Sequence, residues 1–249
     1  MLRYMIRSYA SDRIAIVAAG NIDHDALVSH FAPLFESLDK PTHDNSRVAP
    51  RSNAGLSMHF KDLEQVHLCL GAEAPSQRSD KRFACAVLNA ILGGNMSSRL
   101  FQEIREKRGL AYAVYSFLSL YSDTGLIGVY VATDPQNVNP VLSTIRKELE
   151  RLGNGDLSAD DVSAAKDYLV GGVYLSSENM DNRMVRLAKN EFLLGKYVSY
   201  DELVERLQRV TAEEVVELAG SIFRDGGFSL TTLGPFREGD LEKSHLWMG

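Results

Sequence analysis

The sequence is poor in the features that mark several classes of protein. It has only two cysteines, Cys69 and Cys85, and both lie in apolar contexts without the spacing of metal ligands, so we expect two buried thiols. The formal net charge is -6 and the basic residues are scattered, which argues against a nucleic-acid partner. No apolar run approaches the roughly eighteen residues that a membrane helix needs, so no membrane partner is expected.

The N-terminus shows no secretory signal. The run MLRYMIRSYASDR contains cations, but no apolar segment with a small-residue cleavage site follows it. We therefore expect a cytoplasmic protein, while a signal peptide on a longer precursor stays open.

Catalytic motifs are missing as well. There is no Gly-x-Ser-x-Gly elbow, and neither cysteine has the surroundings of a nucleophile. No histidine has a glutamate and a second histidine at the offsets of a zinc-binding His-x-x-Glu-His motif. The six histidines are His24, His30, His43, His59, His67 and His245. We expect no catalytic residue, metal ligand or cofactor in this chain, and a site made by His59 with His67 is the alternative left open.

The most informative stretch that is present covers residues 93–121, GGNMSSRLFQEIREKRGLAYAVYSFLSLY. It predicts a helix that begins near Ser97 or Ser98, because serine hydroxyls suit an N-cap. Arg99, Glu103 and Lys107 recur at four-residue spacing and predict an exposed charged face. Gly109 can take the left-handed conformation that ends a helix, and the residues from Tyr112 to Tyr121 favour a strand.

Arg105 and Tyr112 flank the predicted turn between this helix and this strand. A guanidinium at the helix end and a phenol at the strand start can both point into one space, where their donors could hold a peptide carbonyl. A simpler interpretation is that Arg105 caps the carbonyls of its own helix and that Tyr112 is an ordinary strand residue. The residue types alone leave both open.

The chain before this stretch divides at a polar segment. A strand over residues 13–19 is followed by the Gly20-Asn21 turn and a helix capped by Asp23 that runs to Leu38. A single strand cannot form a domain, because both of its edges stay unpaired. Residues 40–54 are rich in Pro, Asn, Ser and charge, which predicts a linker. We therefore expect residues 1–39 to need a partner that is absent here or supplied from elsewhere, and residues 55–249 to form a domain of their own.

The second domain reads as an α+β fold, with helices packed on one face of a mainly antiparallel sheet. Strands are expected first, then a mainly helical part, then a closing strand. The predicted strands cover residues 56–60, 65–73, 112–121, 124–133 and 228–233, and the predicted helices cover 80–92, 138–152, 158–176, 179–194, 200–207 and 212–223. Ser158 and Thr211 are the predicted caps of the helices that begin at or directly after these residues.

The run GGNMSSRLFQEIREKRGLAYAVYS resembles the signature segment in the C-terminal half of pitrilysin-type zinc peptidases, which include insulin-degrading enzyme and the processing peptidases. The resemblance implies a processing-peptidase-like domain in which Arg105 and Tyr112 hold the substrate backbone over a zinc ion carried by the other half. It also implies that residues 1–39 close that first half, whose zinc motif lies upstream in the family.

Two functions follow from this resemblance. The preferred one is the substrate-binding half of a zinc endopeptidase, inactive alone, with an extended peptide and a zinc-bearing half or subunit as partners. The alternative is a non-enzymatic scaffold or assembly subunit of the same family. The unpaired strand and the apolar face of the helix after it also predict exposed apolar surface, and hence a homodimer.

Overall fold

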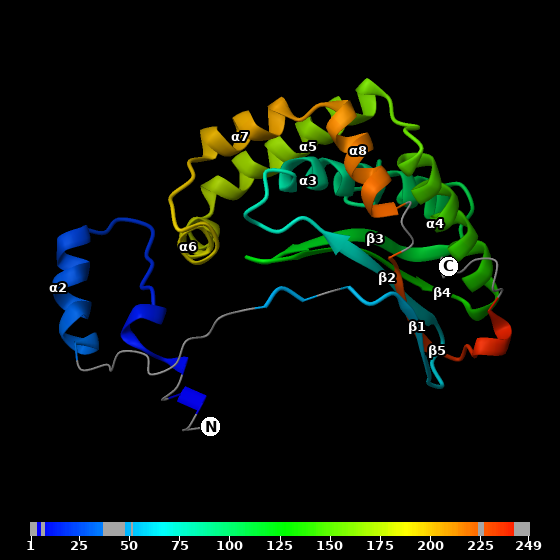
Figure 1. Ribbon diagram of the computed structural model, residues 1–249, viewed down its shortest axis with the longest axis horizontal. Coiled ribbons are helices and arrows are strands. Elements are labelled where there is room, and N and C mark those ends of the chain that lie inside the picture. The colour runs from blue at the N-terminus through cyan, green and yellow to red at the C-terminus, as the bar shows by residue number, and fades with distance from the viewer. Residues whose placement is uncertain (1–3, 6–7, 37–47, 51, 224–226, 242–249) are drawn as a thin grey trace. The chain divides into compact units, whose positions relative to one another are not determined.

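The computed structural model describes the chain except for residues 1–3, 6–7, 37–47, 51, 224–226 and 242–249 (Figure 1). Contacts between residues divide it into two compact units. The smaller unit contains residues 1–49 and 173–200, and the sheet unit contains residues 50–172 and 201–249.

The sheet unit is built on a mixed sheet of five strands in the order β1-β5-β2-β4-β3. Only the β1 and β5 pair is parallel, and the other neighbours are antiparallel. β1 and β3 therefore form the two edges. The strands are β1 (Gly55–Phe60), β2 (Val66–Ala74), β3 (Ala111–Leu120), β4 (Gly125–Thr133) and β5 (Ser229–Gly234). The predicted α+β class and its mainly antiparallel sheet are confirmed.

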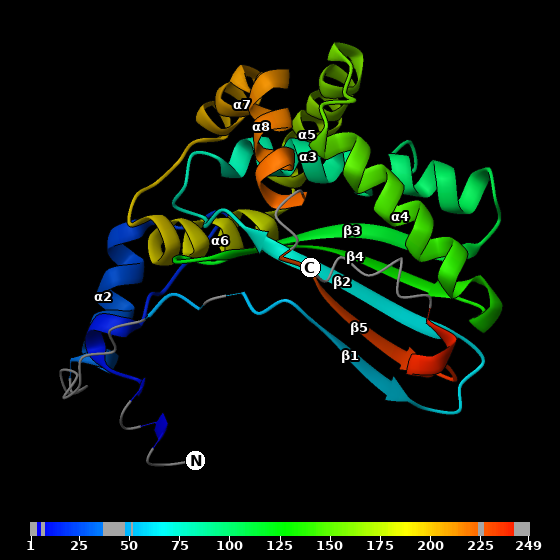
Figure 2. The same cartoon turned by 45° about the vertical axis from the view of Figure 1, so that its right-hand side comes forward.

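Helices cover one face of this sheet. Figures 1 and 2 show α3 (Arg82–Leu92), α4 (Val138–Gly153) and α8 (Ala212–Phe223) on the same side. β2 shows why, since its side chains alternate between buried residues such as Leu68 and more exposed ones such as Cys69. A strand with one apolar face must bury that face against another layer.

Cys69 corrects one expectation. It lies on the face of β2 that points away from α3, α4 and α8 and is exposed, whereas Cys85 in α3 is buried as predicted. The alternation of side chains along a strand decides this difference, and the apolar neighbours of Cys69 in the sequence lie on the opposite face of the sheet.

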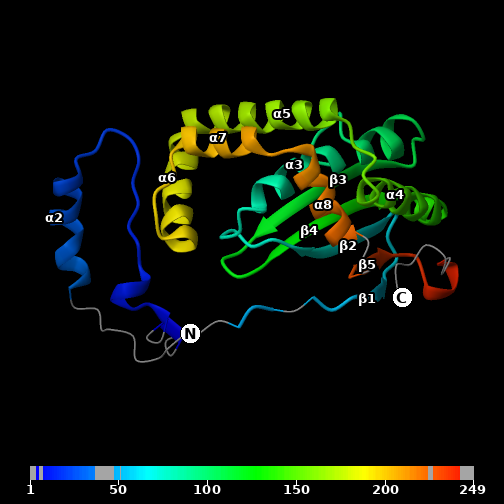
Figure 3. The same cartoon turned by 45° about the horizontal axis from the view of Figure 1, so that its top comes forward.

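Two more helices of this unit lie alongside each other, α5 (Ala159–Glu178), which continues into the smaller unit, and α7 (Tyr200–Arg209) (Figure 3). The Lys166 ammonium of α5 donates to the Gln208 carbonyl of α7 over 2.9 Å. The predicted cap of α5 is also present, because Ser158 Oγ accepts from the Asp161 N–H. Asp161 completes a capping box by accepting from the Ser158 N–H at 3.2 Å.

The smaller unit contains the 3-10 turn η1 (Ser11–Arg13), α2 (His24–Phe35), α6 (Met180–Lys189) and the π-helical η4 (Asn190–Leu194). The predicted N-cap of α2 is confirmed, since Asp23 Oδ1 accepts from the Ala26 N–H at 2.9 Å. α2 ends at Phe35, and residues 37–38 of the longer predicted helix lie outside the described residues.

The prediction of a strand over residues 13–19 is wrong. The backbone from Ile14 to Ala19 has no strand assignment, because no strand of the described chain pairs with it. A strand exists only through hydrogen bonds to a neighbour, which the local sequence cannot supply. Most of the predicted linker at residues 40–54 lies outside the described residues, and the division at 39 and 55 stays a prediction.

None of the helices in the described ranges combines the length and apolar character that crossing a membrane would need.

Candidate functional site

The helix that carries Arg105 is not an ordinary α-helix. Residues Phe101–Glu106 form a π-helical segment, η2, and the Lys107 N–H donates to the Gln102 carbonyl five residues earlier over 2.9 Å. Such widened turns are rare and occur often at functional sites. The four-residue spacing of the charges predicted a helix here, but an apolar and charge pattern does not distinguish an α-helix from a short π-helix.

Asn95, rather than a serine, organises the start of this helix. Asn95 Oδ1 accepts from the Ser97 N–H at 2.8 Å, and its amide nitrogen donates to the Ala90 carbonyl at 3.2 Å. The helix begins at Arg99, directly after Ser98, so its predicted start is confirmed. The Ser98 hydroxyl, however, donates back to the Asn95 carbonyl. Asparagine side chains form such local turns readily, and they compete with capping.

The end of the helix is fixed as the sequence predicted. Gly109 has a φ of +60°, the left-handed region that favours glycine. The Leu110 N–H donates to the Ile104 carbonyl over 2.9 Å, which closes the last turn. The hydroxyl of buried Thr133 in β4 donates to the Leu110 carbonyl, so the turn between η2 and β3 is tied to the sheet.

Tyr112 lies in a β-bulge at the start of β3. Ala111 pairs with Thr133 and Ala113 pairs with the next residue of β4, Ala132, so Tyr112 is the extra residue between them. A bulge bends a strand locally and changes the direction of a side chain. The Tyr112 residue is 76% exposed, in a strand whose neighbouring Ala111 and Val114 are buried. Nothing in the local sequence marked this bulge.

These two irregularities bring Arg105 and Tyr112 together. Cζ of Arg105 lies 4.3 Å from the centre of the Tyr112 ring and 4.8 Å from the centre of the Phe101 ring. The only ion pair of Arg105 in the described chain is a long one, with Nε 3.7 Å from Glu106 Oε1. Among the described residues, the Arg105 guanidinium makes no hydrogen bond to the carbonyls of its own helix, so it does not cap them as in the simpler interpretation.

The N-terminal end of the helix is held by charges. The Arg99 guanidinium donates to the Asp156 carbonyl at 2.6 Å and to Asp161 Oδ2 at 3.3 Å, and its other terminal nitrogen lies 3.8 Å from Glu148 Oε2. The side chain of Glu148 is 3% exposed and accepts from Arg151 at 2.9 Å. Burial alone would raise the pKa of Asp161, but its hydrogen bonds from Ser158 and Arg99 outweigh burial and lower it.

The expected exposed charged face is therefore only partly correct. Lys107 Nζ donates to Glu103 Oε1 over 2.6 Å, and this hydrogen bond lowers the pKa of Glu103. Arg99, in contrast, is largely buried among the carboxylates of α4 and α5. Its role as an anchor depends on Glu148 and Asp161, which are about fifty to sixty residues away in the sequence.

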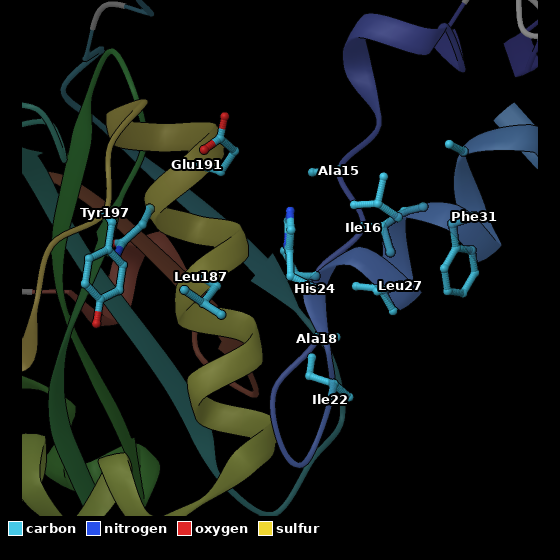
Figure 4. A pocket seen from close by; sticks show the side chains of 14 residues that line it. Ala15, Ile16, Ala18, Ile22, His24, Leu27, Phe31, Leu187, Glu191 and Tyr197 are labelled. Carbon is cyan, nitrogen blue, oxygen red and sulfur yellow. The ribbon is translucent and has the colours of Figure 1, made fainter. Parts of the chain in front are cut away.

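A second feature is an apolar pocket of about 670 Å³ inside the smaller unit (Figure 4). Ile16 and Leu27 line it from the N-terminal segment, and Leu187 and Tyr197 line it from α6 and the residues after it. α2 itself buries none of its residues, and Leu34 is 63% exposed. The predicted exposed apolar surface is therefore present in the isolated chain.

The open alternative of a metal site at His59 and His67 is not supported. His59 Nε2 is 3.0 Å from Ser57 Oγ on the same strand, and His67 Nδ1 is 2.7 Å from the Tyr130 hydroxyl. Leu233 of β5 lies between the two histidines in the sheet register, so they are not on neighbouring strands. Across the described residues, no three His, Cys, Asp or Glu side chains gather where they could hold a metal ion.

Comparison with known proteins gives the family. The sequence matches the family described as "Peptidase M16 inactive domain" over residues 1–169, and the chain therefore belongs to that family. It is similar to proteins named as uncharacterized zinc proteases. One from Mycobacterium tuberculosis is 36% identical over 93% of this chain and 54% of its own length. One from Bacillus subtilis is 34% identical over 94% of this chain and 56% of its own length.

Solved structures share the fold. A peptidase M16 inactive domain from Pseudomonas fluorescens has a TM-score of 0.76 and 22% identity, covering 87% of this chain and 52% of its own. A chain in a structure of complex III2 from Candida albicans has a TM-score of 0.83 and 20% identity, covering 98% of this chain and 60% of its own. The chain spans about half the length of the curated relatives that it matches.

Proposed function

We propose that this chain is the substrate-binding half of a zinc endopeptidase and that Arg105 and Tyr112 hold the backbone of an extended peptide. The observation that carries the proposal is the geometry of this pair. The Arg105 guanidinium lies over the Tyr112 ring beside an edge strand, and its donors have no hydrogen-bonded partner in the described chain. A guanidinium and a phenol offer several hydrogen-bond donors to a backbone carbonyl, and such contacts do not depend on the side chains of the peptide.

The edge of β3 supports the binding of an extended segment. Within the described chain β3 has a neighbouring strand on one side only, and an unpaired edge can add a peptide through backbone hydrogen bonds. The Ser116 N–H already donates to the Gly93 carbonyl at 3.0 Å, which closes the middle of this edge. A bound peptide would therefore use the end of β3 at Tyr112, next to Arg105.

Hydrolysis needs a zinc ion from elsewhere. The described residues contain no cluster that fits zinc, and the relatives named as zinc proteases are about twice as long as the match. Under this proposal the chain binds and orients the peptide, and a zinc-bearing half or subunit supplies the metal centre. The extended residues Ile14–Ala19 and the exposed apolar face of α2 give that half, or a second copy, a surface to pack against.

The first test measures peptide binding by the full chain, with fluorescein-labelled casein as an unfolded probe and fluorescence anisotropy as the readout. We expect Arg105→Ala to weaken binding about tenfold or more, because it removes charge-assisted hydrogen bonds. Arg108→Ala is the matched control. Arg108 ends the same helix but pairs with Glu103 at 3.8 Å, so its loss should leave affinity nearly unchanged.

Several outcomes of this test would contradict the proposal. Equal binding by the unaltered chain and Arg105→Ala would favour the alternative, a non-enzymatic scaffold in which this pair does not bind peptide. Failure of the unaltered chain to bind the probe would also count against it. Stoichiometric zinc in the purified chain would overturn the assignment of zinc to another half.

A separate measurement tests the partner surface. The unaltered chain should associate in sedimentation velocity experiments, and Leu27→Asp should shift it toward the monomer, because Leu27 lines the apolar pocket of the smaller unit. Ser29→Asp on the same helix is the control, since its side chain is exposed and only bonds to the Ala26 carbonyl. Equal association of both variants would exclude this face as the interface.

A further inference from the structure

We infer that Phe101 is a positioning residue, whose ring sets the direction of the Arg105 guanidinium. This inference rests on the proposed function and adds a third residue to it. In this role Phe101 acts through Arg105. It would hold Arg105 so that the N–H groups at the rim of the guanidinium point toward a backbone carbonyl.

The contacts of Arg105 carry this inference. Its guanidinium lies over the faces of two rings, at 4.8 Å from Phe101 and 4.3 Å from Tyr112. Attraction to a ring face acts on the flat side of a guanidinium and leaves the hydrogens at its rim free. The Arg105 guanidinium is therefore held in a defined position while its N–H groups stay available to a ligand.

The competing partner is weak. Glu106 lies 3.7 Å from Arg105 Nε, and its side chain is 51% exposed, so water screens this ion pair. A long arginine side chain at the surface otherwise loses considerable rotamer entropy when it binds a ligand. Two rings that already hold the guanidinium reduce this loss, which is preorganisation.

The helix explains why Phe101 can act in this way. Leu100 and Ile104 are fully buried and fix the helix to the core. Phe101 is four residues before Arg105, and residues at this separation lie on one face of neighbouring helical turns. The ring of Phe101 is therefore held by a rigid element, while Tyr112 is held by the bulge at the start of β3.

The test separates a ring face from apolar volume. Phe101→Leu and Phe101→Met keep an apolar side chain and lose the ring, while Phe101→Tyr keeps the ring. We expect the leucine and methionine variants to bind labelled casein about three- to tenfold more weakly and the tyrosine variant to bind normally. Chemical denaturation of each variant reports stability in parallel, and the methionine variant decides if the leucine variant does not fold.

A spectroscopic readout checks the direction of Arg105 itself. The nuclear Overhauser contact between the Arg105 Nε–H group and the Tyr112 ring should weaken in Phe101→Leu and persist in Phe101→Tyr, because this contact reports the position of the guanidinium independently of the ring current of Phe101. A residue that only fills space would not produce this difference between leucine and tyrosine.

The outcomes distinguish the inference from the function on which it rests. Suppose that Arg105→Ala loses binding, while Phe101→Leu binds normally and its Nε–H contact with the Tyr112 ring is unchanged. This result would overturn the role of Phe101 and leave the proposed function in place. Normal binding in Arg105→Ala would overturn the proposed function, whatever the Phe101 variants do. Equal losses in the leucine and tyrosine variants would also overturn the inference, because they would show a requirement for phenylalanine packing.

Discussion

α2 and α3 are both mainly apolar helices, but they differ in how many of their residues are buried. Both helices are about three turns long and mainly apolar, with sequences HDALVSHFAPLF and RFACAVLNAIL. α3 buries eight of its residues against the sheet unit, whereas α2 buries none in the described chain. An apolar stripe on a helix therefore predicts a surface that must be covered, but it does not identify the element that covers it.

For α3, the sheet unit supplies the surface that covers its apolar face. α3 contacts β3 and α8, and Val87 and Leu88 are completely buried there. The residues from Ile14 to Ala19, before α2, make no strand pair in the described chain. α2 therefore keeps an exposed apolar face, which is the feature that led us to propose an additional half or a second copy at this surface.

The largest expected effect comes from truncating one leucine in each helix. Leu88→Ala should lower the free energy of unfolding by about 2–5 kcal/mol, because it leaves a cavity in a packed core. Leu34→Ala should change it by less than about 0.5 kcal/mol at concentrations where the chain is monomeric, since Leu34 is exposed in the single chain. Urea denaturation followed by circular dichroism measures both. A large cost for Leu34→Ala would mean that α2 is covered in solution.

α4 carries one buried and one exposed glutamate, which allows a second comparison of burial with exposure. Glu148→Gln should destabilise the protein by about 1–3 kcal/mol, because Glu148 is buried with Arg99 and Arg151 around it. Glu150→Gln should cost less than about 0.5 kcal/mol, since it removes only the exposed pair with Arg146. Equal effects in urea denaturation would show that the Arg99 anchor contributes nothing to stability.

The reactivity of the two cysteines tests their burial directly. Iodoacetamide should modify exposed Cys69 in the native protein and Cys85 only after unfolding. Partial burial of its thiol still raises the pKa of Cys69, so its modification should need mildly alkaline pH. Mass spectrometry of native and unfolded samples decides this, and native modification of Cys85 would contradict the packing of α3.

The pH dependence of Cys85 follows from its burial, which raises the pKa of the thiol to about 12. An unfolded thiol ionises near about pH 8.5, so the unfolded state binds fewer protons than the native state above that pH. The contribution of Cys85 to stability is therefore complete below about pH 8.5 and decreases as the pH rises toward 12, by at most about 1.4 kcal/mol per pH unit. The Cys85→Ala variant should lack this part of the slope, and an unchanged slope would contradict it.

The sequence was a good guide to the elements of the sheet unit. Alternating apolar residues predicted β2, the three-and-four spacing predicted α3, and Ser158 and Thr211 predicted the caps of α5 and α8 correctly. These features depend on residues close together in the chain. Period and capping are local properties, so a single sequence contains them.

The candidate site was predictable only in part. The spacing of Arg105 and Tyr112 and the left-handed Gly109 were visible in the sequence, and the structure places the two side chains in contact. The π-helical turn, the bulge at Tyr112 and the anchor of Arg99 on Glu148 were not visible. Each of them depends on a strand pairing or an ion pair with a distant part of the chain.

Local residue patterns identified most helices and strands of the sheet unit, several of their caps, and an arginine and a tyrosine that flank one turn. Only the tertiary structure decided which apolar helix is buried, which cysteine is exposed, and how the Arg105 guanidinium lies over two aromatic rings. The physical reason is that propensity and periodicity act between near neighbours in the chain. Burial, strand register and ion pairing require surfaces that distant segments bring together.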